Sequence, residues 1–137
     1  MAAVVKSTKA GIDAISATKC IRIDELLTAS GAAFDKYDAV YIDSDGKVRP
    51  VGIGDSALVH FDGFAMSDND STGGLPCTIL GLGLIMEWLE DSDDYTPGQL
   101  LYASEVAHEL STVSLSSRAA IARAITNTEI IVVAAPR

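Results

Sequence analysis

The chain has 137 residues, of which 48% are hydrophobic, and it carries a formal net charge of −9. This length fits one domain with a real core but not two, and the apolar content excludes a chain that stays disordered. No apolar run reaches the length of a membrane span, and the amino terminus lacks the long apolar stretch of a secretory signal. We therefore expect synthesis in a cytoplasm and no membrane partner.

The charge is unevenly distributed along the chain. Residues 1–36 carry five basic and four acidic side chains, whereas residues 37–110 carry two basic and fourteen acidic ones. An acidic body repels a phosphate backbone, so we expect no direct nucleic-acid partner. A mildly basic segment on an acidic body suits docking to a protein surface. A solvated acidic face that only keeps the protein soluble explains the same charges.

The first 18 residues are rich in Ala, Ser, Thr and Lys, and Gly11 interrupts any helix. They predict an arm that is loosely ordered until a partner holds it. The chain is thus divided into a flexible N-terminal arm, residues 1–18, and a β-rich domain, residues 19–137. Cys20–Asp24 alternates apolar and polar residues, as a half-buried strand does. Glu25–Ser30 predicts a short helical turn that ends at the following glycine.

The strongest local signal is a β-hairpin. Two β-prone runs, Ala39–Asp43 and Lys47–Val51, flank Ser44–Gly46, and an Asp-Gly pair supplies the positive φ that a tight turn requires. Pro50 has no N–H to donate, so the second strand should lie at an edge or end there. The Asp-Ser-Asp-Gly string also resembles part of a calcium loop, but both end positions of such a loop fail here.

Further strands and loops follow the hairpin. Ala57–Phe61 and Pro76–Leu80 predict strands, and the polar cluster Ser67–Gly74 predicts a loop. Leu82–Leu89 fits either a two-turn helix or a pair of strands around Gly83.

Towards the C-terminus, Thr96–Gly98 predicts a turn before a strand at Leu100–Ala103. Local propensity favours helix within residues 104–125, where alanine and arginine are frequent. Glu129–Val133 is strongly β-prone.

One pattern occurs twice in the chain, about sixty residues apart. An aromatic residue stands seven places before a tyrosine that closes an apolar triplet, first as Phe34 and Tyr41 and then as Tyr95 and Tyr102. Two matching half-units indicate one compact β-rich body, since two copies are too few for a solenoid.

A second shared string follows each copy some two dozen residues later, and it pairs Gly63–Ser67 with Ala122–Thr126. Because the first of these predicts a strand, the match favours strands over helices within residues 104–125.

Few residues suit catalysis or metal binding. His60 and His108 are the only histidines, and satisfied or solvent-facing histidines explain them better than a catalytic base. A hydrolase that uses either histidine with a nearby aspartate is the enzyme alternative. Cys20 and Cys77 lack metal-ligand spacing, so two buried thiols are favoured and a disulfide is the alternative. We expect no enzymatic activity, no metal and no cofactor.

Six short motifs stand out when the chain is taken in order: Asp38–Tyr41, Asp45–Val48, Gly63–Ala65, Pro97–Tyr102, Ala122–Ile125 and Glu129–Val133. Together they resemble the capsid decoration (cement) proteins of tailed bacteriophages. The resemblance spans residues 31–133, and its specificity lies in the order and spacing of the motifs. The acidic stretch 87–94 departs from the pattern.

The resemblance implies a mainly β fold, namely a small β-barrel or β-tulip-like single domain with an extended N-terminal arm and at most short helices. It also implies a homotrimer on the capsid exterior of a virion, which bridges major capsid protein subunits and stabilises the expanded shell without catalysis. Extended arms commonly make the bridging contacts. The residues expected to contact the capsid are Val4, Val5, Lys6, Lys9, Lys19, Ile21, Arg22 and Ile23.

A different class of function is the alternative. A fibre or adhesion module would bind host-surface glycans through the acidic loops 68–74 and 91–94.

Overall fold

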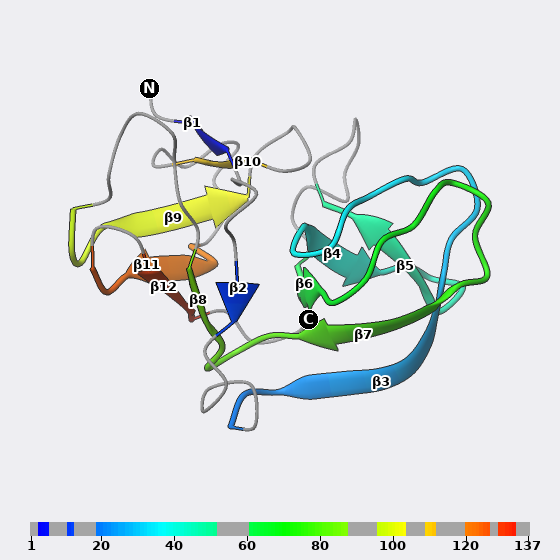
Figure 1. Cartoon of the computed structure of the whole chain (residues 1–137), viewed down its shortest axis with the longest axis horizontal. Helices are drawn as coiled ribbons and strands as arrows, with labels where there is room; N and C mark the ends of the chain where they lie inside the picture. Colours follow the sequence, from blue (N-terminus) through cyan, green and yellow to red (C-terminus); the bar gives the residue numbers. More distant parts are fainter. Residues whose placement is uncertain are drawn as a thin grey trace.

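The computed structural model describes residues 3–5, 11–12, 19–51, 61–87, 96–103, 109–111, 120–126 and 129–133. Within these ranges all regular secondary structure is β-strand and no helix is present, so the predicted mainly β fold class is confirmed (Figure 1). The strands are β1 (Ala3–Val5), β2 (Gly11–Ile12), β3 (Arg22–Thr28), β4 (Ala39–Ile42), β5 (Lys47–Pro50), β6 (Gly63–Ala65), β7 (Pro76–Leu80), β8 (Ile85–Glu87), β9 (Leu100–Ala103), β10 (Glu109–Ser111), β11 (Ala122–Ala124) and β12 (Glu129–Val132).

Strands β3 to β7 form a closed barrel in the order β3-β5-β4-β6-β7. All neighbours are antiparallel except β3 and β5, which pair in parallel at Leu27 and Thr28 only. The register of β3 against β7 shifts between Ile23 and Leu26, and Glu25 within this bulge has a φ of 63°. A bulge bends its strand, so the end of β3 leaves β7 and reaches β5.

The remaining strands form a seven-stranded sheet in the order β1-β10-β9-β11-β12-β8-β2, with every neighbouring pair antiparallel. Its five central strands come from the second half of the chain. The two outermost strands come from the amino terminus, so β1 covers the edge of β10 and β2 covers the edge of β8 (Figure 1).

The repeat predicted from the sequence is present in the strand order. Strands β5-β4-β6-β7-β3 of the first half correspond one to one with β10-β9-β11-β12-β8 of the second. The registers agree, because Val40 pairs with Gly63 where Leu101 pairs with Ala122. Other corresponding pairs are Tyr41–Arg49 with Tyr102–Ser111, Ala65–Ile79 with Ala124–Ile130, and Ile23–Ile79 with Met86–Ile130.

The turn that leads into β4 and β9 also repeats. The Asp38 N–H donates to the Asp35 carbonyl at 3.1 Å, and the Gln99 N–H donates to the Thr96 carbonyl at 3.0 Å. In both turns the last side chain accepts a hydrogen bond from the first N–H, at 2.8 Å to Asp38 Oδ2 and 3.3 Å to Gln99 Oε1. The predicted turn at 96–98 is thus confirmed.

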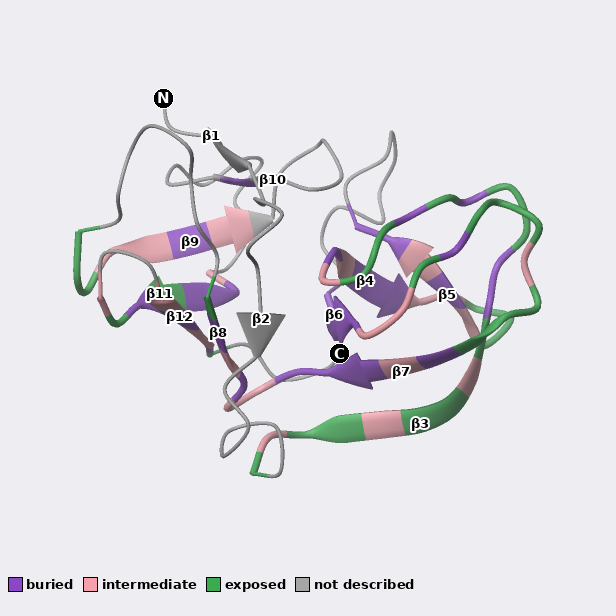
Figure 2. Ribbon diagram, in the orientation of Figure 1, coloured by how far each residue is buried: buried purple, intermediate pink, exposed green. Residues whose placement is uncertain are grey.

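Two hydrophobic cores hold the strands together. Alternate side chains of β4, β6 and β7 belong to different cores, as expected where both faces of a strand are buried (Figure 2). The barrel core contains Phe34, Val40, Val48, Ala65, Cys77 and Ile79. The larger core joins Tyr41, Val51, Phe61, Phe64 and Leu80 of the first half to Leu84, Met86, Leu101, Leu110, Ile121, Ala122, Ala124, Ile130 and Val132 of the second.

Most of the strand predictions agree with the structure. The hairpin is formed by β4 and β5, with Gly46 at a φ of 76°, and β5 ends at Pro50. Pro76–Leu80, Leu100–Ala103 and most of the final β-prone run are strands. Around Gly83 the described residues form neither a helix nor a strand pair, because a turn there leads into the single strand β8, which pairs with β12 and β2.

The helix predicted at Glu25–Ser30 is wrong, because β3 runs through most of this segment to Thr28. Helix-favouring side chains are overridden by pairing with β7 and β5. Within residues 104–125, the described segments at 109–111 and 122–124 are strands, as the repeat predicted. The strand predicted at Ala57–Phe61 lies largely outside the described residues.

We expect Gly63→Ala to lower the free energy of unfolding by about 3 kcal/mol. A Cβ atom at this position would stand 2.5 Å from both the Leu80 carbonyl oxygen and Ile79 Cγ2. The corresponding position in the second half is Ala122, so Ala122→Gly is the matched control, with an expected loss of about 1 kcal/mol. Urea denaturation measures both, and a smaller loss for Gly63→Ala than for the control would contradict the close approach of β6 and β7.

Candidate binding surface

The residues expected to contact a capsid fall into two separate places. Val4 and Val5 lie on β1, where they pair with Leu110 and Glu109 of β10. Lys19, Ile21, Arg22 and Ile23 lie at and before the start of β3, which Figure 1 shows at the opposite end of the view from β1. Lys6 and Lys9 lie outside the described residues.

The start of β3 exposes both basic and apolar side chains. Lys19 and Arg22 are exposed, Ile21 is 39% exposed, and Ile23 is half-buried against the barrel core. Leu27, at the far end of the strand, is 41% exposed. Figure 2 shows β3 as the strand of the barrel with the most exposed residues. Such a mixture of charge and apolar surface is typical of a protein-binding surface.

Two of the charged groups on this strand, Arg22 and Asp24, form a salt bridge. Arg22 Nε donates to both carboxylate oxygens of Asp24 at 2.9 Å, and the Thr78 hydroxyl donates to Asp24 Oδ1 at 2.9 Å. The hydrogen bond from Arg22 and, to a smaller extent, that from Thr78 lower the pKa of Asp24. Arg22 is therefore presented as part of a salt bridge.

One backbone edge of β3 is largely uncovered. The strand pairs with β7 on one side along most of its length, and with β5 on the other side only at Leu27 and Thr28. Among the described residues, no strand pairs with the Arg22–Asp24 segment on the side away from β7. An uncovered edge presents N–H and C=O groups that another extended chain can pair with.

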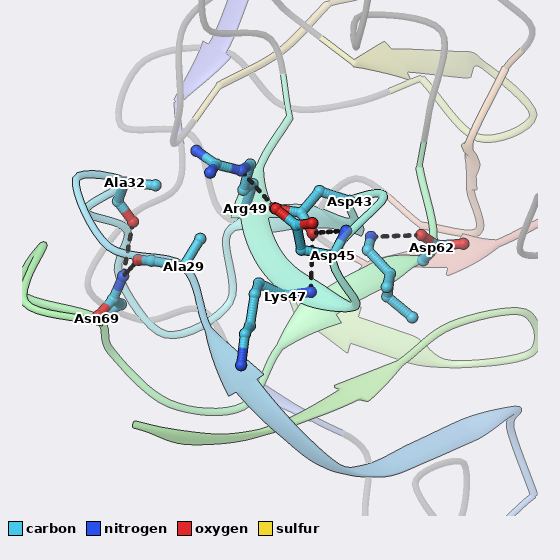
Figure 3. A network of polar contacts seen from close by, with 9 residues as sticks. Ala29, Ala32, Asp43, Asp45, Lys47, Arg49, Asp62 and Asn69 are labelled. Atoms are coloured by element: carbon cyan, nitrogen blue, oxygen red, sulfur yellow. Dashed lines mark hydrogen bonds and ion pairs between the residues drawn. The ribbon is translucent and has the colours of Figure 1, made fainter. Parts of the chain in front are cut away.

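The acidic hairpin turn is built by its own hydrogen bonds (Figure 3). Asp43 Oδ1 accepts from the backbone N–H groups of Asp45 and Lys47, both at 2.9 Å, and Asp43 Oδ2 forms an ion pair with Arg49 Nε at 2.6 Å. Burial raises the pKa of Asp43, but the hydrogen bonds from Lys47, Arg49 and Asp45 outweigh it and lower the pKa overall. The hairpin explanation of this string is therefore supported over a calcium loop.

The acidic loop 67–74 is anchored by a buried asparagine. The Asn69 side-chain amide donates to the carbonyls of Ala29 at 3.0 Å and Ala32 at 2.7 Å (Figure 3). Its oxygen accepts from the Thr28 hydroxyl at 3.1 Å. The backbone of Asn69 also bridges Phe34. The predicted loop is present, and Asn69 within it is part of the barrel structure.

The exposed acids of this loop also take part in local structure. The Asp68 carboxylate accepts from the Lys36 N–H at 2.6 Å, and the Asp70 carboxylate accepts from the Thr72 N–H at 3.0 Å. The hydrogen bonds from the Thr72 backbone and side chain lower the pKa of Asp70.

The cysteines are free thiols rather than a disulfide. Cys77 is buried in the barrel core and Cys20 is half-buried, and burial raises the pKa of both thiols. Within the described ranges, no three His, Cys, Asp or Glu side chains group as metal ligands. His60 and His108, like the acidic segment 91–94, lie outside those ranges.

Two features of this surface had no clear signal in the sequence. The pairing of β1 and β2 with the second sheet involves segments of two or three residues, too short for periodicity to reveal. The anchoring role of Asn69 depends on carbonyls some forty residues away. A lone asparagine between two aspartates gives no local sign of burial.

No protein family, curated protein or solved structure with which the chain was compared matches it. Among the residues described, none belongs to a helix long and apolar enough to cross a membrane.

We expect Asp43→Asn to destabilise the protein by about 1.5 kcal/mol at neutral pH, because it removes the charge that Arg49 and two N–H groups stabilise. Since folding lowers the pKa of Asp43, its contribution is complete above the unfolded-state value of about 4 and is lost as the pH falls through the folded-state value. The difference between wild type and variant should therefore shrink below about pH 4. Denaturation at several pH values measures it, and a difference independent of pH would contradict this role.

We expect Asn69→Ala to lower the free energy of unfolding by about 3 kcal/mol, because three buried hydrogen bonds are lost and two carbonyls are left without a donor. Asp70→Ala, at an exposed neighbour in the same loop, is the control and should cost less than about 1 kcal/mol. Thermal denaturation compares them. Equal losses would mean that Asn69 does not anchor the loop.

Proposed function

We propose that the protein is a structural virion protein that binds the exterior of a tailed-bacteriophage capsid. It stabilises the expanded shell by bridging major capsid protein subunits, acts as a homotrimer and catalyses no reaction. The observation that carries this proposal is the surface at the start of β3, where Arg22 on the strand and Lys19 and Ile21 just before it are exposed.

The resemblance to decoration proteins supports the same proposal through the elements on which it rests. Its motifs fall on the β4–β5 hairpin, on β6, on the turn before β9 and on β11 and β12. These strands and turns belong to the two repeated five-strand units. The motifs that resemble the family therefore lie in the structural framework of the molecule. A rigid frame with exposed side chains on one strand suits a binding protein.

Repetition makes weak contacts sufficient for this role. Each trimer presents three copies of the β3 surface to several capsid subunits at once. Linked contacts gain effective concentration, so the trimer binds far more tightly than one surface alone. A small protein can therefore hold a large shell without a deep pocket.

The glycan-binding alternative is less well supported by loop 67–74. Asp68 and Asp70 accept hydrogen bonds from backbone N–H groups of the protein itself, and Asn69 is buried. The polar groups of this loop are thus used to maintain its shape.

We expect the purified protein to co-sediment with expanded, undecorated capsids at micromolar concentration, and Arg22→Glu to weaken binding about tenfold. Three repeated contacts that each lose about 0.5 kcal/mol account for that factor. Arg123→Glu reverses an exposed charge on β11 and serves as the matched control. The absence of co-sedimentation by the wild-type protein would refute the proposed function. Equal weakening by both variants would move the contact away from β3.

A further inference from the structure

In the second half of the molecule, the strand that corresponds to β3 has its outer edge covered. Strand β8 corresponds to the start of β3 in the repeat, since both pair with the last strand of their half in the same register. On its other side β8 pairs with β2. At the corresponding side of β3, the Arg22–Asp24 segment has no strand beside it among the described residues.

The two edges also carry similar residues. Strand β2 places Ile12 opposite Met86 and Gly11 opposite Glu87. The residues of β3 that correspond to Met86 and Glu87 are Ile23 and Asp24. Each edge therefore presents an apolar residue followed by an acid, in the same register and on the same side of the repeated unit.

We propose that Gly11 and Ile12 of a second copy of this chain pair antiparallel with Asp24 and Ile23 of β3. The pairing uses backbone groups at the strand edge, whereas side chains of a strand point to its two faces. The exposed side chains of Lys19 and Ile21 therefore stay accessible to another protein. The exchange is a contact between copies of the chain, separate from capsid binding, and it requires no capsid.

Charge is compatible with this partner. Extended by one residue, the proposed register sets Asp13 of the second copy opposite Arg22, whose guanidinium already forms a salt bridge with Asp24. Opposite charges directly across an antiparallel pair are favourable, so Asp13 can share this exposed guanidinium.

The geometry of the exchange also permits a closed assembly. An arm that pairs with the β3 edge of the next copy forms a heterologous contact, and such contacts generate rings when the rotation closes. In a ring every copy donates one segment and receives one. Each strand pair lost at β8 is thus replaced by a strand pair at β3, which keeps the cost of the exchange low.

Crosslinking between two different chains tests the proposal. One chain carries Gly11→Cys and the other carries Asp24→Cys, both with Cys20→Ser and Cys77→Ala, and a short bismaleimide is added to the mixture without capsids. We expect a linked heterodimer at least tenfold more abundant than with a control chain carrying Asp45→Cys, an exposed position in the β4–β5 turn. A single chain with Gly11→Cys and Glu87→Cys checks the reaction, since these positions pair within one chain.

A heterodimer yield no greater than that of the Asp45→Cys control would overturn the proposal. Linkage only within a single chain carrying both Gly11→Cys and Asp24→Cys would overturn it as well. So would homodimers of the Asp24→Cys chain alone, because they would mean that two β3 edges pair directly.

Hydrogen exchange on the unaltered protein gives a second measurement, which does not depend on how the cysteine variants fold. The backbone amides of residues 22–24 should become more protected as the protein concentration rises, and unchanged protection across the range in which oligomers form would refute the exchange. Neither measurement contains capsids, so failure of the proposed function would leave both results unaffected.

Discussion

The structure depends on how each of two similar five-strand units covers its outer edges. A strand edge with unpaired N–H and C=O groups is costly to bury and prone to unwanted pairing in solvent. The first unit solves this in part by closure, because β3 has seven residues and a bulge at Glu25 that carries its end to β5, while among the described residues no strand covers the Arg22–Asp24 edge. The corresponding strand β8 is described over only three residues. The second unit instead takes β1 and β2 from the amino terminus.

The packing of one unit against the other explains why corresponding positions of the repeat can carry different residues. Phe64 and Arg123 occupy the same register position of the two units. Phe64 is fully buried because the outer face of β6 packs into the core shared with the second sheet, whereas Arg123 is exposed. The inner positions Val40 and Leu101 are both fully buried. At this position the two units therefore differ because Phe64 packs against the other unit and Arg123 does not.

Much of the fold was predictable because the signals are local. Alternating residues and the Asp-Gly pair located the strands and the hairpin, and the doubled pattern decided between helix and strand at Ala122–Ala124. The misjudged segment, Glu25–Ser30, has helix-favouring residues whose conformation is set by pairing partners far away in sequence. The turn residue Tyr37 adopts a φ of 72° where its counterpart in the second half is a glycine, and a tyrosine gives no warning of that conformation. Of the residues expected to contact a capsid, Lys19, Ile21, Arg22 and Ile23 lie together because they are close in sequence. Val4 and Val5 lie on a different sheet because their position depends on a long-range pair.

The same constraint links the amino terminus to assembly. Because the second sheet borrows strands from residues 3–5 and 11–12, the ends of that sheet are completed by segments that the chain supplies from outside the repeated unit. A segment that completes an edge by backbone pairing is selective for register and direction more than for side-chain identity. Under the proposed exchange, two edges compete for this segment, and a high local concentration of copies favours the edge in another copy. Under the proposed function, binding sites recur at short intervals on a capsid, so docking and exchange would reinforce each other.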